Sequence, residues 1–185
     1  TFVMDNLESK NYKRVQNSIT IFAVVSAIIS LGIILLAPEV VRVIGGVKYG
    51  AAVALIPGSV LAVFFQILTS ILAIILTYDK NVVKTAIITG AIAVISVALK
   101  ILLLRQMGIE ILPIINTIAF VCTLIANYYL VRQAGYAACI DLKKVGIAIL
   151  GLVIVSGLST LLYQNNLIRY CLIFVVAIAF FIAAY

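Results

Sequence analysis

The sequence predicts an all-α, polytopic membrane protein with six transmembrane helices in antiparallel hairpins. The chain of 185 residues is 65% hydrophobic and only 10% charged, and its mean hydropathy is +1.31. A soluble domain of this size could not bury so much apolar surface in one core. The apolar residues also fall into six runs, each near the length of about 20 residues that a helix needs to cross a bilayer. None of the runs has the polar face of a surface helix.

Short connections, which hold most of the charge, separate the six runs. In chain order the runs are Ser18 to Ala37, Ala51 to Tyr78, Val82 to Leu104, Ile109 to Val131, Val145 to Tyr163 and Leu167 to Tyr185. A polar-rich segment precedes the first run and further spans follow it, which is not the pattern of a cleaved signal peptide. Three polar residues join the second run to the third, and three join the fifth to the sixth. Connections this short predict antiparallel hairpins.

Prolines and tyrosines refine this picture of the helices. Pro57-Gly58 lies in the second run and Pro113 in the fourth. Because proline removes a backbone hydrogen bond and crowds the preceding turn, we predict kinks near the outer ends of these two helices. Tyrosines close to the ends of the runs, among them Tyr163 and Tyr170, are interpreted as anchors in the headgroup region.

The basic residues are unequally divided between the two sides of the predicted bundle. The side with the N-terminal segment carries eight of them, namely Lys10, Lys13, Arg14, Lys80, Lys84, Arg132, Lys143 and Lys144, and the opposite side carries Arg42, Lys48, Arg105 and Arg169. Since translocation of basic loops is disfavoured, the first side is predicted to be cytoplasmic. We therefore expect a multi-pass protein of the plasma (inner) membrane with both ends of this chain inside.

Several function classes are disfavoured by composition. The net charge is +7, but the basic residues are scattered over the connections, which argues against nucleic-acid binding. The chain has no His and its three Cys are irregularly spaced, so neither a metal site nor a redox pair nor any cofactor is predicted. Every carboxylate lies in or beside a connection, so acid–base chemistry cannot be assembled within the membrane, and we do not expect an enzyme.

One segment carries a distinctive motif. Residues Leu36 to Tyr49 read LAPEVVRVIGGVKY, a polar turn follows at 79–81, and Gly108 precedes a helix that leads to Arg132. Over residues 35–132 this pattern resembles the C-terminal half of the polysaccharide flippases of the multidrug/oligosaccharidyl-lipid/polysaccharide (MOP) superfamily. The segment Ile109 to Pro113 departs from that family's pattern, which usually has small residues after the glycine turn.

The resemblance implies that this chain is the C-terminal part of a larger MOP-type helical transporter. Residues 1–133 would supply a cytoplasmic linker and four helices of the C-terminal lobe, and residues 134–185 an additional transmembrane hairpin. The implied substrate is a lipid-linked oligosaccharide, such as an undecaprenyl-diphosphate sugar repeat unit. The other implied partners are membrane lipid and the N-terminal half of the same protein. The implied mechanism is alternating access, in which no covalent bond changes.

Two groups of cations are candidates for contact with such a substrate. Arg42 and Lys48 flank two glycines in an outer connection, where they would form either a cationic mouth or a solvated loop without a ligand. Lys84, with Lys80, lies at the cytoplasmic end, where it either meets the diphosphate or only sets the orientation.

Three further candidates lie inside the spans. Lys100 is close enough to the outer end of its run to snorkel to the surface; alternatively it faces a hydrophilic path, because Thr89 and Ser96 share its helical stripe. Gln66 and Asn116 carry amides that suit sugar hydroxyls, although such groups more often bond to a neighbouring helix.

Two other functions remain open at this point. A cation-coupled multidrug exporter of the same superfamily would need acidic groups in its cavity, whereas every carboxylate of this chain lies in or beside a connection. A non-transporting anchor or scaffold of a polysaccharide synthase complex would need no further spans upstream, whereas a flippase needs them.

The predicted orientation can be tested by cysteine labelling. In a protein whose Cys122, Cys139 and Cys171 are replaced by Ala, we expect Lys80→Cys to react with a membrane-impermeant maleimide only from the cytoplasmic side. The same measurement on Lys48→Cys should show labelling only from outside. Labelling of position 80 from outside alone would contradict the orientation.

Overall fold

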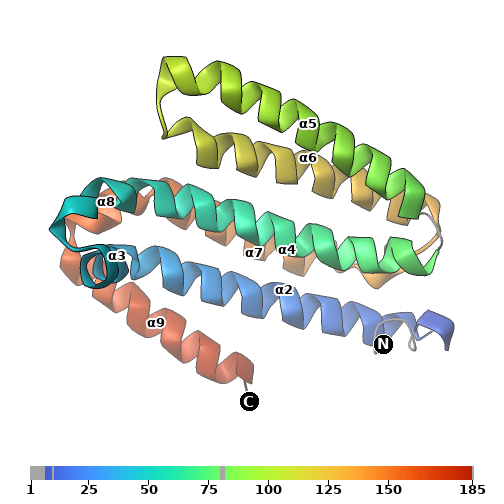
Figure 1. The fold of residues 1–185 in the computed structure, drawn as a ribbon. Helices are drawn as coiled ribbons and strands as arrows, with labels where there is room; N and C mark the ends of the chain where they lie inside the picture. The colour runs from blue at the N-terminus through green and yellow to red at the C-terminus, as the bar shows by residue number, and fades with distance from the viewer. Residues whose placement is uncertain (1–6, 10, 80–81, 185) are drawn as a thin grey trace.

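The chain is helical throughout the residues that the computed structural model describes, which are 7–9, 11–79 and 82–184, and these residues contain no strand (Figure 1). The α-helices are α2 (Tyr12–Leu35), α3 (Ala37–Gly45), α4 (Ile56–Tyr78), α5 (Val82–Met107), α6 (Ile111–Gln133), α7 (Leu142–Gly157), α8 (Ser159–Gln164) and α9 (Asn166–Ala184). Two 3₁₀-helices, η1 (Val47–Leu55) and η2 (Ala137–Cys139), complete the order. The predicted all-α class is confirmed.

Four helical segments of the described chain are long and apolar enough to cross a membrane. They are Tyr12–Leu35, Lys48–Tyr78, Val82–Met107 and Ile111–Gln133, and they correspond to the first four predicted spans. A chain with four such segments is suited to a lipid environment.

The fifth predicted span, Val145 to Tyr163, is not one continuous helix. It is divided between α7, with 16 residues, and α8, with 6. The division lies at Leu158, whose backbone leaves helical geometry at φ −89° and ψ 1°. The hydroxyl of Ser159 donates to the carbonyl of Ser156 at 2.7 Å, which supports the tightened turn. The sixth predicted span overlaps α9, which has 19 residues but is not one of the four membrane-length segments, so the expectation of six spans stays a prediction.

The bundle is built around α2 and α4. Helix α4 packs on α6 and α2, α2 packs on α7 and α9, and α5 packs mainly on α6. Buried residues of α2 and α4, such as Ala23, Ile34, Phe64 and Leu68, form the core with Leu152 of α7. In α5, by contrast, Ser96 alone is buried. Helices α2, α4, α6 and α7 therefore hold the core, and α5 lies at the periphery (Figure 1).

Successive connections alternate between the two ends of the bundle, as the hairpin prediction requires. Helix α3, the α5–α6 turn and the α8–α9 junction lie at one end, and the start of α2 and residues 134–141 lie at the other (Figure 1). The first end, here called the α3 end, carries the four basic residues that the loop-charge rule places outside.

A tyrosine cluster closes the opposite end. The ring of Tyr136 makes edge contacts with Tyr12 and Tyr78 at centroid distances of 6.3 and 6.2 Å. Burial, and to a lesser degree the nearby Asp79 carboxylate, raises the pKa of Tyr136. Burial also raises the pKa of the Cys139 thiol, which is fully buried beside this cluster. Tyr136 and Cys139 are therefore packed at this end of the bundle and carry no charge at physiological pH.

The prediction that Pro57 and Pro113 bend their helices is wrong. Pro57 lies in the first turn of α4, and Pro113 is the third residue of α6. The first-turn N–H groups of a helix have no partner within the helix, so proline can begin a helix without losing a hydrogen bond. Both prolines therefore start helices instead of bending them. The preceding residues of the second span form η1 in place of a kinked α-helix.

These two helix starts approach each other closely. A Cβ atom placed on Gly58 would lie 2.9 Å from Cβ of Pro113, a separation that real structures do not tolerate. The hydroxyl of Thr117 lies 3.2 Å from the carbonyl oxygen of Gly58, to which it can donate. Glycine at position 58 is thus required by the contact between α4 and α6.

Substitution of Gly58 tests this contact. We expect Gly58→Ala to lower the free energy of unfolding by about 1–3 kcal/mol, because the rigid Pro113 ring cannot move aside without shifting a helix. The matched control is Gly90→Ala, where an added Cβ meets no described atom within 4 Å, so that helix propensity should raise stability by about 0.5–1 kcal/mol. Thermal unfolding in detergent gives both values, and equal effects would contradict the close approach.

Candidate functional site

A groove runs along the exposed face of α2 and α4. One part, of about 620 Å³, is lined by Ser18, Ile19, Phe22, Gln66, Ile67, Ser70, Ile71 and Ile74. A second part, of about 280 Å³, is lined by Ser26, Ile29, Ser30, Ile33, Ser59, Val60, Val63 and Ile67. Since both parts share Ile67, they form one α2–α4 groove. In Figure 1, α7 lies behind these two helices.

Gln66 is the most polar side chain of the α2–α4 groove. It is exposed near the middle of α4, and its amide has no hydrogen-bond partner among the described residues. Three of the groove serines differ from it, because Ser18, Ser59 and Ser70 donate to the backbone carbonyls four residues earlier at 2.9–3.0 Å. An unpaired amide facing hydrocarbon is unfavourable. Gln66 is therefore suited to meet a polar group that enters the groove.

A second, more polar cavity lies at the α3 end. Its volume is about 400 Å³, and it is lined by Pro38, Glu39, Val41, Arg42, Gly46, Gly50, Val53, Tyr163, Arg169 and Tyr170. We call it the end cavity. Its residues come from α3, η1, α8 and α9, so segments more than 100 residues apart in the sequence meet there.

An ion pair between α3 and α9 forms one wall of the end cavity. Nη2 of Arg169 donates to Oε1 of Glu39, and the side chains are 5% and 35% exposed, respectively. The Tyr170 hydroxyl donates to the same Oε1 at 3.2 Å, and its ring lies 5.1 Å from the Arg169 guanidinium carbon. Glu39 Oε2 and Arg169 Nε are buried without a partner in the described structure.

The break between α2 and α3 places Glu39 in this cavity. Pro38 has no N–H to donate to the carbonyl of Ile34, four residues earlier, so α2 ends at Leu35 and Leu36 caps it. The hydroxyl of Tyr163 donates to that carbonyl at 2.8 Å. Helix α3 then runs across the bundle axis and is seen end-on in Figure 1. Its Val43 and Ile44 are exposed, and neither lines the end cavity.

The six residues predicted to bind substrate do not meet in one place. Arg42 lines the end cavity and Gln66 lines the α2–α4 groove. Lys48 is exposed on η1, Lys84 is exposed at the opposite end of the bundle, and Asn116 is half-buried on α6. Lys80 lies outside the described residues.

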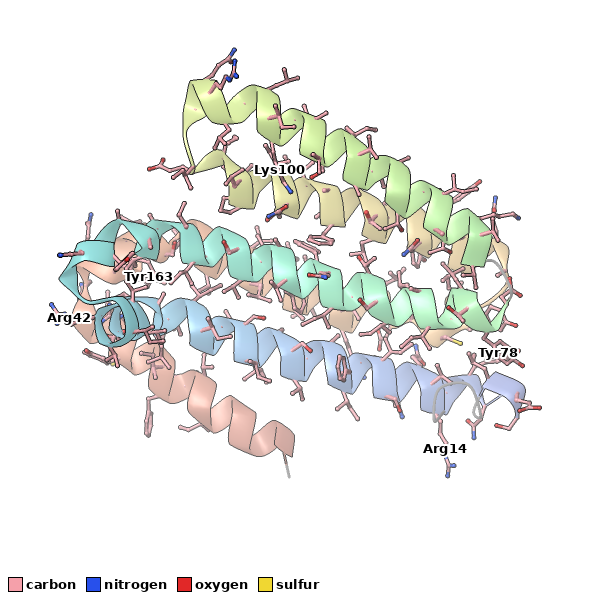
Figure 2. The ribbon with its side chains drawn as sticks, in the orientation of Figure 1. Arg14, Arg42, Tyr78, Lys100 and Tyr163 are labelled. Carbon is pink, nitrogen blue, oxygen red and sulfur yellow. The ribbon has the colours of Figure 1, made fainter. Side chains whose placement is uncertain are left out.

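Lys100 lies on the side of α5 that faces α6 (Figure 2). It is half-buried, and no carboxylate of the described chain pairs with it. Ser96, one turn earlier, is buried on the same stripe, whereas Thr89 is exposed. Lys100 lines neither the groove nor the end cavity.

Sequence reasoning missed four residues of the end cavity. Glu39 and Arg169 were assigned to connections, and Tyr163 and Tyr170 were interpreted as headgroup anchors. One signal could have identified Tyr163: Pro38 leaves the Ile34 carbonyl without its usual donor, and hydrocarbon supplies none. Nothing in the sequence indicated that α9 meets α3.

No family model, no curated protein and no solved structure matches this chain. Within the described residues, no group of three His, Cys, Asp or Glu side chains could hold a metal ion. The site must therefore be interpreted from its own geometry.

Removal of the Tyr163 hydroxyl tests the α2–α3 junction. Tyr163→Phe should lower the free energy of unfolding by about 1–3 kcal/mol, because it deprives the Ile34 carbonyl of its donor. Tyr129→Phe is the matched control, since Tyr129 is 60% exposed and makes no hydrogen bond to a described residue. Thermal unfolding in detergent measures both, and the contribution of the bond is refuted if the two variants unfold alike.

Proposed function

We propose that this chain forms part of a membrane flippase that moves lipid-linked oligosaccharide across the plasma membrane by alternating access. The observation that carries the proposal is the α2–α4 groove, in which the exposed, unpaired amide of Gln66 lies near the middle of a membrane-length helix. A sugar headgroup offers such an amide both donors and acceptors. The LAPEVVRVIGGVKY segment, which resembles the MOP flippases, adds independent support.

The groove suits a cargo that is polar at one end and apolar at the other. Its serines and Gln66 alternate with isoleucine and valine side chains along α2 and α4. Hydroxyl and amide groups would contact the sugars, while the apolar walls and the surrounding lipid would accommodate the polyprenyl tail. The remaining helices, including α7–α8 and α9 as the fifth and sixth spans, would complete the lobe with both ends cytoplasmic.

The lining favours oligosaccharide over the cargo of a cation-coupled exporter. No carboxylate of the described chain lines the groove, whereas a site for a cationic drug or a coupling ion needs negative charge. The function requires no bond to be made or broken, so the chain needs no catalytic residue.

Polysaccharide export by the complete protein tests the proposal. We expect Gln66→Leu to slow export about fivefold, which corresponds to about 1 kcal/mol for a lost hydrogen bond in the transition state. The matched control is Gln106→Leu, since Gln106 is exposed near the end of α5 and away from the groove. Surface polysaccharide in a strain without its own flippase is the readout.

The same assay examines the predicted cations. Arg42→Gln and Lys100→Gln should each reduce export if their charges act on the diphosphate, and Lys143→Gln should not. Normal export by Gln66→Leu would refute a role of the groove, and complete absence of export by the parent protein would favour a scaffold.

A further inference from the structure

We propose that the end cavity binds a glycosyl group beside the ion pair of Glu39 and Arg169 and the ring of Tyr170. This inference rests on the proposed function for the source of the glycan. The chemical argument for the ligand class comes from the cavity itself. Its volume of about 400 Å³ falls within the range of about 300–1,000 Å³ that is usual for small-ligand pockets.

The cavity walls contain an unused donor and an unused acceptor. Nε of Arg169 and Oε2 of Glu39 are both buried without a hydrogen-bond partner among the described residues. The Arg169 side chain is 95% buried, since only 5% is exposed, and it lines the cavity together with Glu39. Leaving such groups unpaired is costly, so a ligand is favoured if it turns the two side chains until these covered atoms face the cavity and are paired.

A hydroxyl group can supply both the donor that Glu39 Oε2 lacks and the acceptor that Arg169 Nε lacks. It can donate to a carboxylate and accept from a guanidinium, whereas a phosphate accepts only. A phosphate would be attracted by Arg169 and Arg42 but repelled by Glu39, which stands in direct contact with Arg169. A ligand rich in hydroxyl groups therefore fits this arrangement better than an anion.

The rest of the lining leaves room for a sugar ring. Tyr170 is 54% exposed, so that its ring offers a flat surface beside the ion pair. Gly46 and Gly50 form another part of the lining, and a Cβ placed on either would meet no described atom within 4 Å. The part of the cavity beside these glycines is therefore open, and the ion pair holds the polar side chains of the lining in place.

The experiment measures binding of a neutral trisaccharide, chitotriose, to the complete protein in phosphatidylcholine nanodiscs by saturation-transfer NMR. We expect binding that inorganic pyrophosphate does not displace. Glu39→Gln should weaken it about tenfold or more, because a charged acceptor of the sugar hydroxyl is lost. Glu110→Gln is the matched control, since Glu110 is an exposed carboxylate at the α3 end but outside the cavity.

A second variant covers the case in which Glu39→Gln fails to fold. Tyr170→Leu removes an exposed side chain and should also weaken chitotriose binding, whereas Tyr129→Leu should not. Absence of binding by the parent protein, displacement by pyrophosphate, or equal affinity in the Tyr170 and Tyr129 variants would each overturn the site. Binding that is lost in both Glu39→Gln and Tyr170→Leu supports it.

The export assay and the binding assay distinguish refutation of the glycosyl site from refutation of the proposed function. If Gln66→Leu exports normally while Glu39→Gln loses chitotriose, the flippase mechanism through the groove is refuted and the sugar site stands. If export depends on Gln66 but Glu39→Gln binds chitotriose as Glu110→Gln does, the site is refuted and the function stands.

Discussion

The structure depends on one constraint: hydrocarbon offers no hydrogen bonds, so the chain itself must satisfy its backbone polar groups. The helices meet most of this demand. The two prolines of the second and fourth spans lie in first turns, where no intrahelical bond is lost. Where Pro38 does interrupt the helix, the hydroxyl of Tyr163 reaches the affected carbonyl. Many hydroxyls bond back to their own helices as well, Thr20, Thr69 and Thr123 among them.

The same constraint separates functional polar groups from structural ones. A threonine that donates to the carbonyl four residues earlier needs no ligand, because its strongest requirement is already met. The Gln66 amide cannot be satisfied in this way and is exposed. Asn127 is a third case, since it is 1% exposed and both its amide atoms lack a described partner. It lines neither the groove nor the end cavity, so it reduces stability without marking a site.

Hydropathy was sufficient to predict the helical class, the first four membrane-length segments and the alternation of connections, because each depends on local composition. The division at Leu158 could not be predicted, since a leucine next to Gly157 and Ser159 is compatible with a continuous helix. Arg42 lines the end cavity and Gln66 lines the groove, and their role in substrate binding stays a prediction. The contact between Glu39 and Arg169 depends on how α9 packs against α2, and no local pattern specifies a contact between residues that are 130 positions apart.

The α2–α3 junction connects the two candidate sites. Ile33 lines the α2–α4 groove, the next residue accepts the Tyr163 hydrogen bond, and Pro38 and Glu39 line the end cavity. Less than two turns of chain therefore separate the groove from the ion pair. Because Leu36 is not helical, the direction of α3 relative to α2 is not fixed by the backbone hydrogen bonds of one continuous helix. It is held instead by packing against η1 and by the ion pair that Arg169 of α9 makes with Glu39. Movement of α8 and α9 against α2 would therefore change the shape of the end cavity, which Tyr163, Arg169 and Tyr170 line, whereas the groove is lined by α2 and α4 alone.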